Sequence, residues 1–300
     1  MKWIVPAAIA LLSLAPGPAE AASPAGGTAR PPSPAAKSEQ RLTELVAAVR
    51  SADYRGDRAA LARLDDELGR LDAGRLDDYR EYWRGFALWR RVLNGFNEKP
   101  APDDLEADVE KALARFTAAL AVHPDWIEAQ LAMVGLWGNQ IYLAGKDEEK
   151  KKAILAEAGP TFRFVMANAG DNPRALWIRG GMEGWAPPPV GGDLPKAAAT
   201  LRYGVQCALR EALRYVHPNP AAPGWVPTWG GPENLMNLAY MYSSAKPPDR
   251  AVALAYAEGA ATAVPEWHFV RDILIPRIEA LPTEAGPAAV ERTPAKSCAP

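Results

Sequence analysis

Residues 103–145 read DDLEADVEKALARFTAALAVHPDWIEAQLAMVGLWGNQIYLAG, and this stretch decides the fold class. Acidic residues at its start can cap a helix and fill the first turn. Apolar residues then recur at helical spacing as far as Pro124, a residue that is tolerated in the first turn of a second helix. The stretch therefore predicts two helices joined by a very short connection, with Asp103 or Asp104 as the cap of the first.

The motif HPDW at 123–126 has a partner at 264–267, where the sequence reads VPEW. An Ala-rich amphipathic run precedes each motif. A small residue, an aromatic residue, a second small residue and then a proline form the pattern of the second helix in tetratricopeptide repeats. The residues in question are Ala112, Phe116, Ala119 and Pro124 before the first motif, and Val252, Tyr256, Ala260 and Pro265 before the second.

On these residues the chain resembles a degenerate tetratricopeptide-repeat protein. The resemblance implies an all-α fold, a right-handed α-solenoid of stacked helical hairpins with Pro/Gly/Trp-rich insertions. The prolines taken to begin helices are 49, 45 and 47 residues apart, which exceeds the roughly 34-residue period of this repeat. These prolines are Pro124, Pro173, Pro218 and Pro265. The segment GGDLPKAAATL at 191–201 is also similar to a turn of exported tetratricopeptide proteins, including helical components of substrate-binding transport systems.

Nearly all of residues 40–281 read as helix, and alternating strand patterns are almost absent. Residues 75–93 carry an aromatic stripe at steps of three and four residues. We interpret this stripe as core packing between helices rather than as a ligand groove. Its members are Tyr79, Tyr82 or Trp83, Phe86, and Trp89 or Arg90.

The composition argues against nucleic-acid binding. The chain has 34 basic and 36 acidic residues and a net charge of −2, whereas nucleic-acid-binding domains carry a basic patch. Two cysteines are too few for a disulfide framework, and they form no metal-binding or redox CxxC pair. We interpret Cys207 as a buried free thiol and Cys298 as a loose thiol in the tail.

The first 21 residues are typical of a secretory signal peptide. Lys2 supplies the positive charge, residues 3–15 form an apolar run too short to span a bilayer, and AEA at 19–21 is a small-x-small cleavage site. Cleavage near Ala21 predicts an exported protein, periplasmic or secreted, without a transmembrane anchor. An uncleaved anchor is the alternative.

The sequence thus divides into four parts. We predict a signal peptide at 1–21, a flexible Pro/Ala-rich tether at 22–39, the helical repeat domain at 40–281, and a disordered tail at 282–300.

No nucleophile elbow, phosphate-binding loop, HExxH or EF-hand pattern occurs. His123, His217 and His268 stand at helix junctions, and none has metal-ligand spacing to another. The sequence therefore indicates no metal, no cofactor and no catalytic residue, and it leaves open whether the protein is an enzyme.

Residues 177–233 depart from a plain repeat pattern, because they contain four tryptophans, three Gly-Gly pairs and two Pro-rich loops. Stiff loops that present Trp could stack on sugars or anchor a Pro-rich peptide. The alternative is that the Trp side chains plug the ends of hairpins. If the loops 184–194 and 222–232 meet, they would surround a cavity. The candidate ligand- or partner-binding residues are Trp185, Trp225, Trp229, Glu183, Asp193 and Glu233.

Three functions follow from these features. The first is an exported scaffold whose concave face binds a protein or peptide of the cell envelope, since repeat solenoids mostly serve as binding surfaces. The second is a protein that binds a small ligand or glycan through the loops of 177–233. The third is a hydrolase or lyase that uses Glu183 and Glu233 as acid and base.

Overall fold

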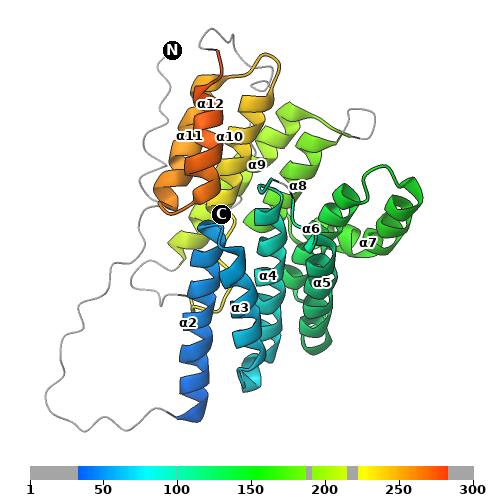
Figure 1. Cartoon of the computed structure of the whole chain (residues 1–300), viewed down its shortest axis with the longest axis vertical. Coiled ribbons are helices and arrows are strands. Elements are labelled where there is room, and N and C mark those ends of the chain that lie inside the picture. Colours follow the sequence, from blue (N-terminus) through cyan, green and yellow to red (C-terminus); the bar gives the residue numbers. More distant parts are fainter. Residues whose placement is uncertain (1–32, 100, 187–190, 215–221, 283–300) are drawn as a thin grey trace, which may run out of the picture.

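The computed structural model describes residues 33–99, 101–186, 191–214 and 222–282, and within them the chain is helical with no strand (Figure 1). The all-α prediction is therefore confirmed. The helices are α2 (Pro34–Tyr54), α3 (Arg58–Gly69), α4 (Asp77–Gly95), α5 (Leu105–Val122), α6 (Ile127–Leu143), α7 (Glu148–Asn168), α8 (Pro173–Trp185), α9 (Leu194–Leu213), α10 (Gly231–Ser244), α11 (Arg250–Ala263) and α12 (Ile275–Glu279), with short turns η1 (Gly74–Leu76) and η3 (Phe269–Leu274), the latter π-helical.

Consecutive helices pack as hairpins: α2 on α3, α4 on α5, α6 on α7, α8 on α9 and α10 on α11. The first helices of neighbouring hairpins also touch, so α2, α4, α6, α8 and α10 form a continuous row. In three of the four connections between hairpins, the second helix of one also packs on the first helix of the next. The stack of hairpins expected from the sequence is thus present.

The first hairpin also meets the last one. The phenol of Tyr54 on α2 donates to Glu233 on α10 at 2.9 Å, and its ring lies edge-on to Trp267 with 5.1 Å between centroids. Segment 222–230, just before α10, reaches α2 and α4 as well: Arg50 on α2 donates to the hydroxyl of Thr228 at 3.4 Å, and Trp83 Nε1 on α4 donates to the carbonyl oxygen of Trp225 at 2.7 Å. Segment 222–230 therefore packs against the row formed by the first helices of the hairpins.

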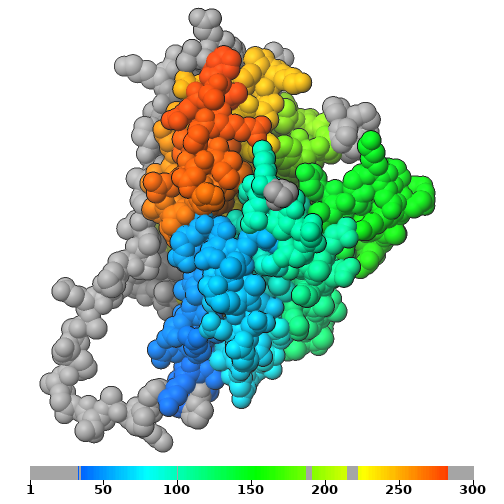
Figure 2. Space-filling model, in the orientation of Figure 1, coloured from blue at the N-terminus to red at the C-terminus, as the bar shows by residue number. Residues whose placement is uncertain are grey.

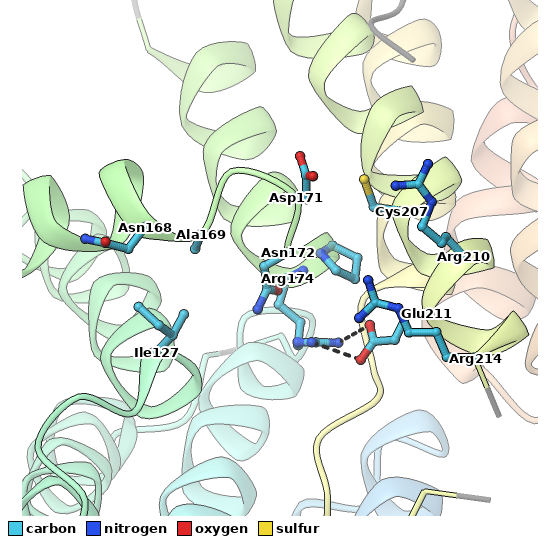
Figure 3. A pocket seen from close by; sticks show the side chains of 11 residues that line it. Ile127, Asn168, Ala169, Asp171, Asn172, Arg174, Cys207, Arg210, Glu211 and Arg214 are labelled. Carbon is cyan, nitrogen blue, oxygen red and sulfur yellow. Dashed lines mark hydrogen bonds and ion pairs between the residues drawn. The ribbon is translucent and has the colours of Figure 1, made fainter. Parts of the chain in front are cut away.

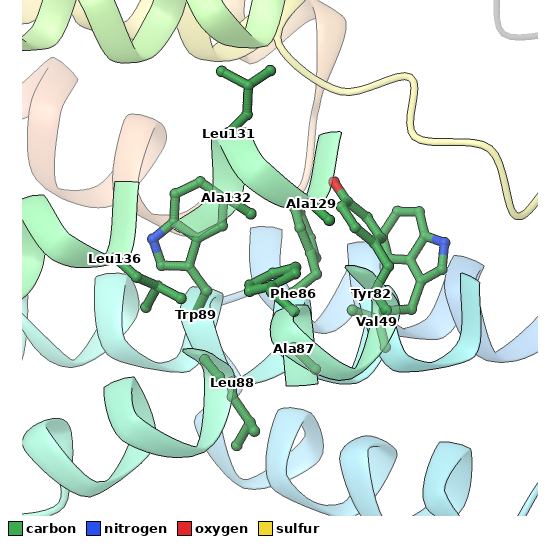
Figure 4. Packing of buried hydrophobic residues seen from close by; sticks show 14 of the residues in the cluster. Val49, Tyr82, Phe86, Ala87, Leu88, Trp89, Ala129, Leu131, Ala132 and Leu136 are labelled. Atoms are coloured by element: carbon green, nitrogen blue, oxygen red, sulfur yellow. The ribbon is translucent and has the colours of Figure 1, made fainter. Parts of the chain in front are cut away.

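The aromatic stripe of α4 is core, as the sequence predicted. Tyr82, Phe86 and Trp89 are buried (Figure 4), Trp83 is buried as well, and Tyr79 is partly buried against the same core. They belong to a first core cluster that runs from α2 to α8, whereas a second cluster joins α9 to α12 and includes Tyr54. The two clusters meet where α2 and α4 face α10.

The two Pro-Trp motifs have the same local structure. In each, the residue before the proline ends a helix, the Trp amide donates to the carbonyl of that residue, and the side chain six positions after the proline donates to the proline carbonyl. Both Trp side chains are buried. The amides of Trp126 and Trp267 donate at 3.2 and 3.1 Å, respectively. The side chains of Gln130 and Arg271 donate to the proline carbonyls at 2.9 and 2.7 Å, respectively.

Two details of the prediction are wrong. Helix α6 begins at Ile127, so Pro124 lies in the preceding turn and not in the first turn of the helix. Because the motifs are 141 residues apart, the counterpart of Phe116 is the fully buried Ala257 and not Tyr256, which is only partly buried. The position of a residue along the helix decides which face it lies on, so matching an aromatic residue to an aromatic residue gave the wrong counterpart.

The helix boundaries differ in places from those expected. Helix α2 starts at Pro34, inside the predicted tether, because the Ser33 hydroxyl caps it by accepting from the amide of Ala36. Asp193 caps α9 as predicted. Asp104 precedes α5 but binds Arg58 and Arg91 instead of capping. Pro218, the signal peptide and residues 283–300 lie outside the described residues. No helix in the described part is long and apolar enough to cross a bilayer.

Candidate functional site

The stack opens between its third and fourth hairpins. Helix α7 packs on α6, but it has hardly any contact with α8, although α3, α5 and α9 all pack on the helix that follows them. Figure 2 shows α7 as part of a lobe that stands out at the right-hand edge of the molecule. Within the described residues, one face of α7 therefore lacks the helical neighbour that α3, α5 and α9 have.

That open face carries apolar side chains at helical spacing. Met166 lines a small hollow together with Ala175, Leu176 and Arg179 of α8, which shows which side of α7 is turned toward α8. Phe162 and Leu155 lie four and eleven residues earlier, on the same side of the helix. We call Leu155, Phe162 and Met166 the α7 stripe. Leu155 is 57% exposed, and Phe162 and Met166 are only partly buried.

A groove of about 340 Å³ lies beside the turn that joins α7 to α8 (Figure 3). Its walls come from the end of α7, the start of α8 and the last turns of α9. We call it the charged groove, because three arginines and two carboxylates line it. These are Arg174, Arg210, Arg214, Asp171 and Glu211, next to Asn168, Asn172 and Cys207.

Arg174 is the fixed centre of the charged groove. It is buried, its Nε donates to Glu128 at 2.8 Å, and its two terminal nitrogens donate to Glu211 at 2.9 and 3.2 Å. Burial alone would lower the pKa of Arg174, but the carboxylates of Glu128 and Glu211 outweigh burial and raise that pKa above its ordinary value. Arg174 therefore stays charged and holds α6, α8 and α9 together.

Cys207 is part of a disulfide bond, so the interpretation of Cys207 as a free thiol is wrong. The sequence signal was misleading because two cysteines 91 positions apart do not form a recognisable framework. Cys298, the other cysteine, lies outside the described residues.

Trp229 and Glu233, two of the predicted binding residues, lie in the core. Trp229 is 2% exposed, lies against Phe86, Trp89 and Trp177, and donates from Nε1 to the hydroxyl of Tyr82 at 3.1 Å. Glu233 is fully buried and accepts from the Gly230 amide at 2.8 Å. Glycine is required at position 230, because its φ is 115° and a Cβ there would lie 3.2 Å from backbone atoms of Pro173 and Arg174.

A buried arginine explains why Glu233 is tolerated there. Arg90 donates to Glu233 at 2.9 Å and to Asp53 at 2.6 Å, and its guanidinium lies over the rings of Phe86 and Trp229. Burial raises the pKa of Asp53, although Arg90 opposes the rise. From the sequence, Arg90 was predicted only as an alternative member of the aromatic stripe. An arginine at that spacing could have indicated a buried ion pair.

Trp185, Glu183 and Asp193 lie at the other end of α8. The Asp193 amide donates to the carbonyl of Glu183 at 2.8 Å, and Trp185 is 54% exposed with its ring 4.7 Å from that of Tyr240. Gly230 contacts Arg174 at the start of α8, and Trp185 comes eleven residues later, which is about 16 Å along the helix.

In the described residues, the six predicted side chains therefore do not surround one cavity. Glu183 accepts from Thr200 and Arg179, whereas Glu233 accepts from Arg90 and the Gly230 amide, so each carboxylate is held by its own set of partners. Trp225 is partly buried against the first core cluster. A role for any of the six in binding stays a prediction.

The chain matches no protein-family model, no curated protein and no solved structure in the comparisons made. The candidate site therefore rests on its own geometry: the partly exposed α7 stripe and the charged groove beside the turn from α7 to α8. No group of three metal-ligating side chains occurs in the described part of the chain.

Proposed function

We propose that this protein is an exported helical-repeat scaffold that binds an amphipathic helix of a cell-envelope protein. The α7 stripe, with Leu155 57% exposed and Phe162 and Met166 only partly buried, is the observation that carries the proposal. Elsewhere in the stack the corresponding helices α3, α5 and α9 pack on a following helix. The α7 stripe is therefore shaped to receive a helix, and helix-in-groove recognition uses apolar anchors at this spacing.

The chemistry of the stripe supports a protein partner. Leu155 and Phe162 offer aliphatic and aromatic surface, and burying such a side chain contributes about 1.5–3 kcal/mol. Contiguous exposed apolar side chains on a monomer often mark an interaction site. Arg179 and Met182 of α8 lie on the other side of the opening, where they could contact the same helix.

The location of the partner differs from the one first expected. Repeat proteins usually carry ligands on the concave face, but here segment 222–230 is packed against the row of first helices. In this proposal the partner binds at the opening between α7 and α8 and not on the concave face. The right-handed twist and the kinship with tetratricopeptide repeats are part of the proposal.

Export is supported by two observations. The N-terminal sequence is typical of a signal peptide, and Cys207 is in a disulfide, a bond that persists mainly in oxidising compartments. We place the mature protein in the periplasm or outside the cell.

A small-ligand or glycan function is the second candidate, and Trp185 favours it. The exposed ring of Trp185 is backed by Tyr240, whose own ring lies 5.0 Å from the guanidinium of Arg277. Aromatic faces held in this way can stack on sugars. Quenching of Trp fluorescence by soluble glycan fragments, lost in Trp185→Ala, would support this function in place of the scaffold.

A pull-down from envelope extract tests the scaffold. Mature wild type is compared with Leu155→Asp and with Val122→Asp, because both residues are exposed apolar positions on second helices of hairpins, 57% and 64% exposed. We expect one envelope protein to be retained by wild type and by Val122→Asp and to be lost with Leu155→Asp. Equal retention by both variants would overturn the proposed site.

A further inference from the structure

The end of α8 and the middle of α10 bring two aromatic rings together near the surface. The ring of Trp185, which is 54% exposed, stands edge-on to that of Tyr240, with 4.7 Å between centroids and 70° between planes. Gly181 lies four residues before Trp185 on α8, and Asn237 lies three residues before Tyr240 on α10. These residues and Arg277 are called the Trp185 cluster below.

Asn237 has a buried side chain that lacks a hydrogen bond. It is 8% exposed, and its amide group has no partner among the described residues, whereas buried polar groups normally have one. A Cβ on Gly181 would lie 3.7 Å from Nδ2 of Asn237 and 3.8 Å from Nε1 of Trp185. The indole N–H of Trp185 likewise has no acceptor in the described part of the chain. Both nitrogens therefore border the space that Gly181 leaves open because it has no side chain.

Tyr240 supplies a third donor to the cluster. Arg277 Nη1 donates to the hydroxyl oxygen of Tyr240 at 3.3 Å, and its guanidinium lies 5.0 Å from the centre of the tyrosine ring. The hydroxyl of Tyr240 acts as an acceptor in this contact, so its own proton remains available to a ligand. The cluster thus places three donors beside two aromatic rings.

Three donors and two rings suit a ligand that carries acceptors and apolar rings. A proline-rich segment has both, because its carbonyls accept hydrogen bonds and proline has no N–H that would need an acceptor. Such segments adopt the extended polyproline II conformation and dock on aromatic surfaces.

A sugar fits the cluster less well. Each hydroxyl donates as well as accepts, so a glycan needs acceptors beside the ring. Glu183, two residues before Trp185, already accepts from Thr200 at 2.6 Å and from Arg179 at 2.9 Å. The cluster itself contains no carboxylate, and the amide oxygen of Asn237 is its one free side-chain acceptor of the amide or carboxylate kind within the described residues.

We infer that the Trp185 cluster is a second docking surface, which binds a proline-rich segment of a partner protein in the polyproline II conformation. Trp185 and Tyr240 pack on the proline rings. The indole N–H of Trp185 and the amide of Asn237 donate to carbonyls of the segment. This surface lies at the far end of α8 from the charged groove, and it takes an extended segment where the α7 stripe takes a helix.

Isothermal titration calorimetry with decaproline tests the inference. Decaproline adopts polyproline II, and a Gly-Ser peptide of the same length is the control ligand. Wild type should bind decaproline and not the control, and Trp185→Ala should weaken binding at least tenfold. No binding of decaproline, or equal affinities for wild type and Trp185→Ala, would overturn the inference. Soluble glycan fragments that bind through Trp185 where decaproline does not would also overturn it, in favour of the glycan function.

A matched pair of glycine variants tests the two nitrogens. Gly181→Ala places a methyl group between the donors and should weaken decaproline binding several-fold. Gly138→Ala is the control, because Gly138 is exposed on α6 and a Cβ there would meet nothing within 4 Å. Alanine favours a helix over glycine, so both variants should keep the wild-type circular dichroism spectrum. Equal affinities for the two variants would reject binding at the space beside Gly181.

Discussion

At the scale of single residues, charged side chains in this protein mark junctions between helices. Arg90 links α2, α4 and α10, and Arg174 links α6, α8 and α9. Each is buried with two carboxylate partners, because an unpaired buried charge would cost several kcal/mol. Sequence alone did not single out either arginine, since their partners lie far away along the chain.

Glu183 gives a pH-dependent prediction. Burial raises its pKa, but hydrogen bonds from Thr200, Arg179 and Lys196 lower it more, so the pKa of Glu183 in the folded protein is below its ordinary value of 4.5. A lowered folded pKa means that these contacts stabilise the protein above the unfolded pKa and are lost as pH falls through the folded pKa. We expect Glu183→Gln to cost about 1 kcal/mol at neutral pH, with the cost fading in acid.

Urea unfolding at neutral pH and well below the ordinary glutamate pKa of 4.5 measures this effect. Glu157→Gln is the control, since Glu157 is exposed on α7 and has no ion pair within the described residues. A cost that does not vary with pH would show that the carboxylate charge of Glu183 has no role.

Replacing the buried Trp229 and the exposed Trp185 should have different effects on stability. Because Trp229 is 2% exposed, Trp229→Ala should lower the free energy of unfolding by about 3–5 kcal/mol. Trp185 is 54% exposed, and its replacement by Ala should change stability by no more than about 0.5 kcal/mol. Similar losses in denaturant unfolding for the two variants would contradict the burial described above.

At the scale of elements, the sequence predicted the helices and motifs that depend on neighbouring residues. The hairpin of α5 and α6 and the repeated Pro-Trp motif depend on residues within one or two turns, so periodicity could reveal them. The opening between α7 and α8 could not be found in this way, because it depends on a contact that is missing between two ordinary helices. The packing of segment 222–230 depends on partners more than 130 positions away, such as Trp83.

The matched motifs predict matched energetics. Trp126 and Trp267 are 8% and 6% exposed and occupy the same place after their prolines. Trp126 packs on Tyr79 and Tyr82, and Trp267 packs on Tyr54. Each Trp→Ala change should therefore cost about 3 kcal/mol. Chemical denaturation that shows a large loss for one variant and none for the other would mean that the motifs are not equivalent in packing.

At the scale of the whole molecule, the fold assigns different roles to two faces. Segment 222–230 packs against the row of first helices, and no described helix fills the opening between the third and fourth hairpins. The sequence predicted an exported repeat scaffold with its partner on the concave face, and it placed the candidate ligand- or partner-binding residues in the Trp-rich segment. Our proposal instead places the partner on α7, and Trp229, one of the candidates, is buried in the core.

Site-specific photo-crosslinking tests this account most directly. A benzophenone amino acid replaces Leu155 on α7 in one variant and Val122 on α5 in the other, and both variants are irradiated in cells that export the protein. The account predicts that position 155 crosslinks to a helical segment of one envelope protein, whereas position 122 gives no such product. Equal products from both positions, or a product from position 122 alone, would contradict it.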